Sequence, residues 1–61
     1  MKYIIRNKTY NTYLKNVIHK KLGHYTCAEN EAKLFNKKEL DEFLGNFKNP
    51  ENIFEIIEIN K

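Results

Sequence analysis

The sequence is poor in the residues from which catalytic and metal sites are commonly built. It has one cysteine, Cys27, and two glycines, Gly23 and Gly45. A lone cysteine excludes an intrachain disulfide and fits a reducing compartment. Two isolated glycines exclude a glycine-rich phosphate-binding loop, and the common nucleotide-binding and hydrolase motifs do not occur. The sequence therefore predicts a protein that is not an enzyme and that uses no metal or cofactor.

Long apolar runs are also missing. Apolar residues come in short pairs such as Ile4-Ile5 and Ile56-Ile57, and runs of that length cannot form a membrane-spanning helix. Residues 1–6 (MKYIIR) place charges where a signal peptide needs an apolar core. We therefore expect a cytoplasmic protein without a membrane partner. A chain of 61 residues has material for one hydrophobic core, so residues 1–61 are predicted to form a single domain.

Acidic residues are missing from the first part of the chain. Residues 1–27 carry six basic side chains and no acid (+6), whereas residues 28–61 carry eight acids and five lysines (−3), which together give the net charge of +3. All four tyrosines lie in the basic part and all four phenylalanines in the acidic part. In one interpretation, phenylalanine fills the core while tyrosine lies half-buried on strands.

A second interpretation of the same pattern is a basic, tyrosine-bearing surface for an acidic partner. The candidate contact residues are Tyr10, Tyr13, Lys15, Lys20, Lys21 and Tyr25. Tyrosine and lysine on a sheet could also stack on and neutralise single-stranded nucleic acid, so a small nucleic-acid-binding module is the alternative function. The single arginine and the acidic second half disfavour that alternative.

The first part of the chain is predicted to form strands. Residues 2–6, 12–18 and 24–26 are rich in β-branched and aromatic side chains. Gly23 is expected in the turn before the third strand, where glycine can take positive φ. We therefore predict a three-stranded meander.

The spacing then changes to that of helices. Residues 28–35 follow a Thr26-to-Glu29 capping-box spacing and predict a short helix. The cap-and-acid spacing recurs at Asn36 and Glu39, before apolar residues at the helical positions Leu40, Phe43, Leu44 and Phe47. Gly45 is either an interior glycine or an early C-cap.

Residues 53–59 are predicted to form the last strand, with apolar side chains on both faces. Such a strand belongs in the middle of a sheet, or another molecule covers it. The order βββααβ predicts an α+β fold, a four-stranded mainly antiparallel sheet with two short helices on one face. Because so small a core barely offsets the entropy of ordering, we expect a homodimer that uses Phe54 and Ile56.

His24 and Cys27 are the most reactive-looking pair in the sequence. Their separation of three residues would suit half of a zinc site or a Cys-His dyad. His19 is the one further donor of this kind, and a structural zinc site needs four ligands. We therefore do not favour a metal protein or an enzyme centred on this pair.

Tyr13-Leu14-Lys15, Glu31-Ala32-Lys33-Leu34-Phe35 and Ile56-Ile57-Glu58-Ile59 form a pattern that spans almost the whole chain. Lys, Asn and Ile, whose codons are rich in A and T, make up 26 of the 61 residues. In both respects the chain resembles very short phage and prophage open reading frames of low-GC bacteria. The resemblance implies a small protein that binds and inhibits a bacterial host protein, such as a component of a defence system.

Overall fold

The computed structural model describes residues 1–60, which form four strands, one α-helix and two 3₁₀ turns. In chain order these are β1 (Lys2–Asn7), β2 (Thr12–His19), β3 (Leu22–Thr26), η1 (Glu29–Glu31), α1 (Lys37–Leu44), η2 (Pro50–Asn52) and β4 (Phe54–Ile59). The strands lie in the order β3-β2-β1-β4, and each neighbouring pair is antiparallel. The predicted α+β class and four-stranded antiparallel sheet are confirmed.

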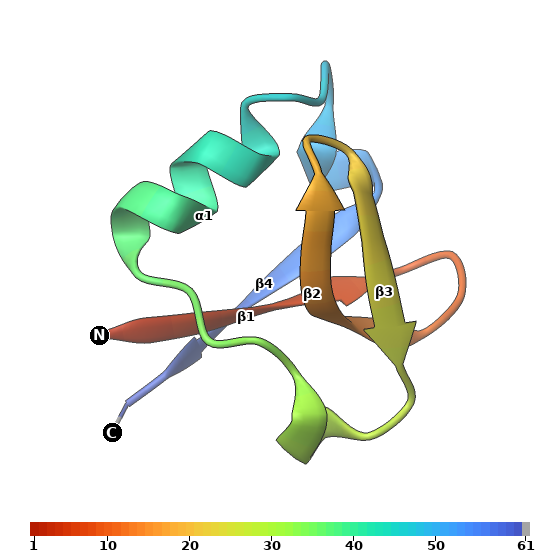
Figure 1. Cartoon of the computed structure of the whole chain (residues 1–61), viewed down its shortest axis with the longest axis vertical. Helices are drawn as coiled ribbons and strands as arrows, with labels where there is room; N and C mark the ends of the chain where they lie inside the picture. Colours follow the sequence, from red (N-terminus) through yellow and green to blue (C-terminus); the bar gives the residue numbers. More distant parts are fainter. Residues whose placement is uncertain (61) are drawn as a thin grey trace.

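The sheet consists of two ribbons that meet at a corner. β1 pairs with β4 along its whole length, but it pairs with β2 through Arg6–Tyr13 and Asn7–Thr12 at one end. Beyond this corner β2 continues with β3, and the β2–β3 hairpin crosses the β1–β4 ribbon steeply (Figure 1). The hairpin therefore projects from the rest of the sheet.

The segment after η1 fills the space that β2 leaves beside β1. Tyr3 and Phe35 exchange two backbone hydrogen bonds, of 2.9 and 2.8 Å, and the Lys33 N–H donates to the Leu14 carbonyl oxygen at 2.9 Å. The predicted helix over 28–35 is wrong, because this stretch holds only the 3₁₀ turn η1. The extended segment completes the hydrogen bonding of two strands, and a helix over the same residues would leave those bonds unmade.

Thr26 acts on this turn in a different way from the predicted capping box with Glu29. Its Oγ1 accepts a hydrogen bond from the Ala28 N–H at 3.1 Å and donates one to Glu31 Oε1, also at 3.1 Å. The glutamate that accepts from Thr26 is Glu31, two residues beyond the predicted Glu29. The contacts hold a single turn in place without starting a helix.

α1 confirms the second predicted helix and its capping box. Asn36 Oδ1 accepts from the Glu39 N–H at 2.8 Å, and Glu39 Oε1 accepts from the Asn36 N–H at 3.0 Å. The helix ends at Leu44 with Gly45 as its C-cap, which settles the role of that glycine. Phe47 lies beyond the helix but still packs against the core.

The core lies between α1 and one face of the sheet. Its buried members are Ile5, Leu14, Phe35, Leu40, Phe43 and Phe54. The Phe43 ring lies 6.2 Å from that of Phe35, 5.5 Å from Phe54 and 5.2 Å from Phe47, measured between centroids. The four tyrosines are half-buried or exposed. The interpretation that phenylalanine fills the core and tyrosine lies on strands is confirmed in part: Phe47 is only partly buried, and Tyr10 lies on the exposed β1–β2 loop.

The sequence predicts Gly23 in the turn before β3, and this prediction is wrong. Gly23 lies in β3 and does not adopt positive φ. Lys20 and Lys21 connect β2 to β3, and Lys20 takes the positive φ of 44°. Gly23 lies within β3, where a Cβ would approach the Asn16 carbonyl oxygen to 2.6 Å and Leu14 Cδ1 to 2.7 Å. Its place is set by the close approach of β2.

β4 is an edge strand, so the prediction of a central position is wrong. The strand order places β1 in the interior of the sheet instead, between β2 and β4. The apolar side chains on both faces of β4 consequently border one open edge. The other expectation for this strand, that another molecule covers it, stays a prediction.

Candidate functional site

The six residues predicted for a partner surface lie on β2, β3 and their loops, but they do not share one face. Tyr13 pairs with Thr26 and Leu14 pairs with Tyr25 across the hairpin. Because side chains alternate along strands, Tyr13 and Tyr25 point to opposite faces. Tyr10 lies on the β1–β2 loop and is 75% exposed.

Tyr25 lies on the same face of the hairpin as the core residue Leu14. Burial raises the pKa of its phenol above the ordinary value of 10.0, and a hydrogen bond with the Asn7 side chain opposes that shift. Asn7 is itself buried, and its Oδ1 accepts from the backbone N–H groups of Thr9 at 2.9 Å and Tyr10 at 3.2 Å. Tyr25 is therefore tied to the corner of the sheet.

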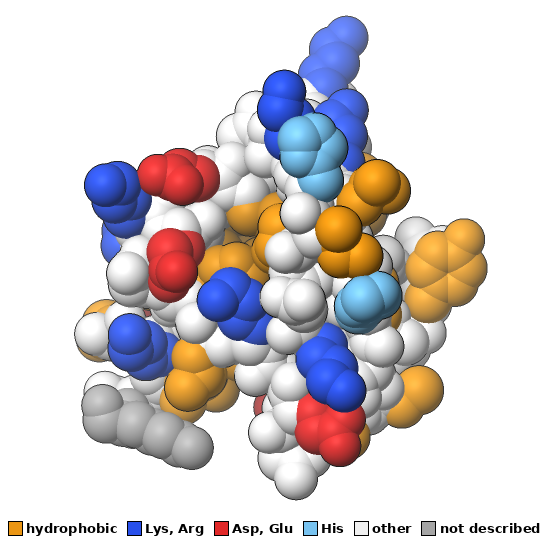
Figure 2. Space-filling model, viewed as in Figure 1, with side chains coloured by type: hydrophobic (Ala, Val, Ile, Leu, Met, Phe, Trp, Pro, Cys, Tyr) orange, Lys and Arg blue, Asp and Glu red, His pale blue; other side chains and the backbone are white. Residues whose placement is uncertain are grey.

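The outward side and tip of the hairpin combine exposed apolar and basic side chains. Ile18 and Leu22 are 57% and 63% exposed, although both are large and aliphatic. The surrounding side chains are basic or imidazole, and residues 12–26 contain no acid. We call this surface the hairpin patch, and it comprises Lys15, Ile18, His19, Lys20, Lys21, Leu22 and His24. Figure 2 shows apolar side chains beside lysine and histidine over the hairpin.

Irregular pairing shapes the hairpin patch. The β2–β3 register shifts between Leu14 and Asn16 and again between Val17 and His19. The two extra residues are Lys15 and Ile18, and a bulged residue re-aims its side chain. Val17, which precedes Ile18, packs against the core. The second bulge thus accompanies the change from a core contact to an exposed aliphatic side chain.

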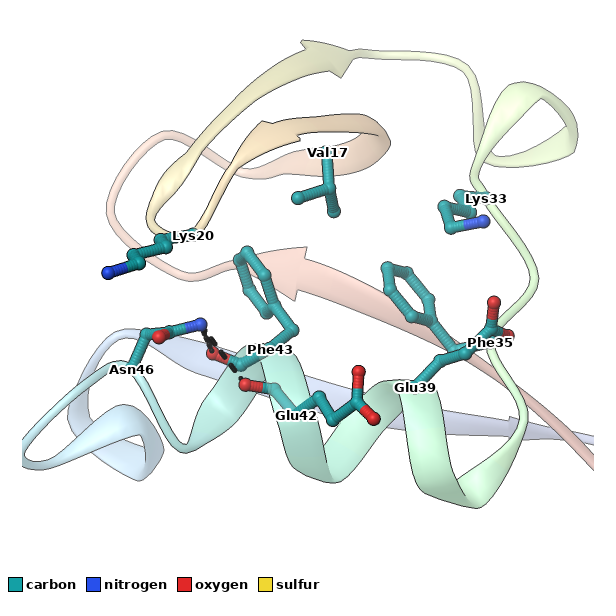
Figure 3. Close-up of a pocket in the computed structure, with 8 residues that line it drawn as sticks. All are labelled: Val17, Lys20, Lys33, Phe35, Glu39, Glu42, Phe43 and Asn46. Carbon is teal, nitrogen blue, oxygen red and sulfur yellow. Dashed lines mark hydrogen bonds between the residues drawn. The ribbon is translucent and has the colours of Figure 1, made fainter.

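A shallow hollow of about 340 Å³ separates the hairpin from α1 (Figure 3). Val17, Phe35 and Phe43 supply its apolar surface, while its charged members have both signs: Lys20, Lys33, Glu39 and Glu42. Asn46 closes one end, where its Nδ2 donates to the carbonyl oxygens of Glu42 at 3.1 Å and Phe43 at 3.3 Å. The mixture of charges gives the hollow no preference for an anion or a cation.

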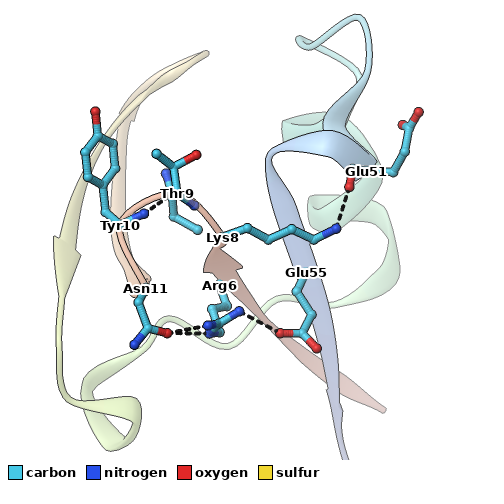
Figure 4. Close-up of polar contacts among 8 residues, drawn as sticks. Arg6, Lys8, Thr9, Tyr10, Asn11, Glu51 and Glu55 are labelled. Carbon is cyan, nitrogen blue, oxygen red and sulfur yellow. Dashed lines mark hydrogen bonds and ion pairs between the residues drawn. The ribbon is translucent and has the colours of Figure 1, made fainter.

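Several basic residues of the first half contact the second half of the chain, and Figure 4 shows two of them, Arg6 and Lys8. Lys15 Nζ also lies 3.8 Å from Glu31 Oε1, and Lys21 Nζ lies 5.6 Å from the centroid of the Phe47 ring. Arg6 donates to Asn11 Oδ1 through Nε at 2.9 Å and pairs with Glu55 Oε1 through Nη1 at 3.0 Å. Lys8 Nζ donates to the Glu51 carbonyl oxygen at 2.8 Å. Arg6 and Lys8 stabilise the corner and β4, while Lys15, Lys20 and Lys21 lie on the hairpin.

Among residues 1–60, no group of three or more histidine, cysteine, aspartate or glutamate side chains is arranged to hold a metal ion. Cys27 is an exposed free thiol. Of the two residues predicted for a dimer contact, Phe54 is 4% exposed within the core, whereas Ile56 is 37% exposed. No helix in this described stretch has the length and apolar character required to cross a membrane.

The protein matches no protein-family model, and no curated protein or solved structure matches it significantly. The exposed pair Ile18 and Leu22 is the feature of the site that the sequence reasoning missed. The predicted strand over 12–18 includes Ile18, whereas Leu22 falls between that strand and the one predicted over 24–26. The register shifts that expose them have no signal in the local sequence, because they depend on how β3 pairs with β2.

Proposed function

We propose that this chain is a non-catalytic binding protein that docks on an acidic surface of another protein through the hairpin patch. The observation that carries the proposal is the exposure of Ile18 and Leu22 beside the lysine and histidine side chains of a hairpin whose own residues 12–26 include no acid. An acid from outside the hairpin approaches at Lys15, whose Nζ lies 3.8 Å from Glu31 Oε1. Isolated exposed aliphatic side chains are common. Two of them at the tip of one projecting hairpin offer a compact apolar anchor.

The two kinds of side chain would contribute differently to binding. Full burial of an aliphatic side chain is worth about 1.5–3 kcal/mol, so Ile18 and Leu22 can supply several kilocalories of affinity. Exposed cations such as Lys20 and Lys21 contribute more to the association rate and to partner choice than to affinity. The partner should therefore offer an apolar depression bordered by carboxylates.

A protein partner suits this surface better than nucleic acid. Base stacking needs aromatic side chains on a common platform, and Tyr13 and Tyr25 point to opposite faces of the hairpin. The resemblance to short phage reading frames supports a partner in the cytoplasm of a bacterial host. On that basis the partner is a host protein, such as a defence-system component, and docking inhibits it.

The proposal is tested by affinity capture from a host lysate, followed by measurement of the dissociation constant for the identified partner. Leu22→Ser removes one anchor, and we expect binding to weaken about 10- to 100-fold. Leu34→Ser is the matched control, because Leu34 is also exposed (45%) but lies outside the hairpin patch. Binding by Leu34→Ser should equal that of the unchanged protein.

Equal partner binding by Leu22→Ser and the unchanged protein would contradict the proposed surface. Oligonucleotide titrations at two salt concentrations provide the comparison with nucleic acid. Tight oligonucleotide binding that falls steeply with salt would instead support the alternative function.

A further inference from the structure

β4 presents a free backbone edge of known register. Tyr3 directs its N–H and C=O towards Phe35, so its neighbour Ile4 directs its own towards β4, where it pairs with Ile57. The same alternation along β4 turns the backbone groups of Phe54, Ile56 and Glu58 away from β1. These residues carry the donors and acceptors of the open edge.

The edge has few of the features that usually block pairing with another strand. β4 contains no proline and no lysine, and its pairing with β1 runs without a register shift from Phe54 to Ile59. Its charged side chains are Glu55 and Glu58, and Glu55 is already paired with Arg6. A second strand can therefore approach along the whole edge.

A hollow of about 420 Å³ lies beside this edge. Leu44, Pro50, Phe54 and Ile56 form its apolar part, and Lys8, Glu51 and Glu55 complete the lining. The side chains of Phe54, Ile56 and Glu58 alternate onto the same face of β4 as this hollow. An added strand would place every second side chain over it.

We infer that the occupant of this edge is a second copy of the chain, related by a two-fold axis, with the two β4 strands antiparallel. This axis is perpendicular to the sheet, so each face of one copy continues into the same face of the other. The axis can then pass through the Ile56 pair or through the Ile57 pair. Centring on Ile56 closes hydrogen-bonded pairs between the two Ile56 residues and at both Phe54–Glu58 positions. Within β4, centring on Ile57 closes only the two Ile56–Glu58 pairs, because Phe54 then lies opposite Asn60, beyond the end of the strand. The first register is therefore favoured.

The charges of the favoured register are self-complementary. Glu58 of each copy lies opposite Phe54 of the other, on the face of the hollow that Lys8 borders. The Lys8 ammonium has a neutral acceptor, the Glu51 carbonyl oxygen at 2.8 Å, so it gains from an added carboxylate. The two-fold axis repeats this Glu58–Lys8 contact, and the two Ile56 side chains meet at the centre.

The test is sedimentation equilibrium of the purified full chain at loading concentrations from about 1 to 300 µM. We expect a monomer–dimer equilibrium that weakens about tenfold with Glu58→Lys and about tenfold with Lys8→Glu, because each change turns two attractions into repulsions. The double variant restores the paired charges, and its dimer should be within about threefold of the unchanged protein.

Ile56→Lys should abolish the dimer, since it brings two ammonium groups together at the axis, while circular dichroism reports an unchanged fold. Leu22→Ser should dimerise as the unchanged protein does, because the hairpin patch is separate from β4. A monomer throughout the concentration range would overturn the inference. A double variant that dimerises no more tightly than the single variants would also overturn it. Neither result would affect host-protein binding through the hairpin patch.

Discussion

Gly23 offers a sharp test of how the hairpin is packed. In Gly23→Ala the new methyl group would lie 2.6 Å from the Asn16 carbonyl oxygen and 2.7 Å from Leu14 Cδ1, where ordinary contacts span 3.4–4 Å. The nearest atom belongs to the backbone, so β2 and β3 must separate by about 1 Å or the Leu14 side chain must leave its rotamer. Overpacking of this kind costs about 1–3 kcal/mol.

That cost is large for this chain. Domains of this size commonly have only about 3–5 kcal/mol of stability. We therefore expect the melting temperature of Gly23→Ala to fall by about 5–20 °C, with a corresponding fall in the urea midpoint. Thermal and urea unfolding followed by circular dichroism measure both quantities.

Gly45→Ala is the matched control. Gly45 caps α1 with φ −65° and ψ −15°, a conformation that alanine also adopts. Its nearest neighbour would be the Asp41 carbonyl oxygen at 3.1 Å, half an ångström farther than the closest contact at Gly23. The control should unfold within about 0.5–1 kcal/mol of the unchanged protein.

Gly23→Ala should be destabilising although the backbone contribution alone has the opposite sign. Considered by backbone entropy and propensity alone, alanine in a strand is favoured over glycine by about 0.5–1 kcal/mol. A Gly23→Ala protein as stable as the unchanged chain, or more stable, would therefore refute the proposed close approach of β2 and β3.

Two further predictions concern the helix cap and pH. Asn36→Ala removes the acceptor for the Glu39 N–H and should lower the free energy of unfolding by about 1 kcal/mol in urea titrations; an unchanged midpoint would contradict the capping role. Burial raises the pKa of Tyr25 in the folded state, so its contribution to stability is fully present below the ordinary pKa of 10.0 and is lost as pH rises through the folded-state pKa. Between neutral pH and about pH 11 the unchanged protein should lose more stability than Tyr25→Phe. Equal losses in the two proteins would contradict the stabilising effect of the protonated Tyr25 phenol.

Much of the local structure follows from the sequence because it depends on neighbouring residues. The α1 capping box needs only Asn36 and Glu39 at a fixed spacing, and the buried positions Leu40 and Phe43 follow from helical periodicity. The strand segments are likewise recognisable from their β-branched and aromatic content. The division of the aromatic residues follows from polarity. The tyrosine hydroxyl favours a position with access to water, whereas the phenylalanine ring has no polar group and favours the core.

Residues 28–35 show where this local reasoning ends. Their spacing favours a helix, but the extended Lys33–Phe35 segment gains hydrogen bonds with Leu14 and Tyr3 that lie far away in the sequence. A helix over these residues would leave those bonds unmade. Gly23 is a similar case, since its need for a small side chain arises from the approach of Asn16 across the hairpin.

The sequence by itself determined the class of the domain, the helix around Phe43, the strand segments and the concentration of basic charge in residues 1–27. The tertiary structure alone decided which surfaces are available. It separated Tyr13 from Tyr25, exposed Ile18 and Leu22 and placed β4 at an edge. The physical reason is that face, register and strand order depend on pairing between distant segments, and that pairing minimises the free energy of the whole chain.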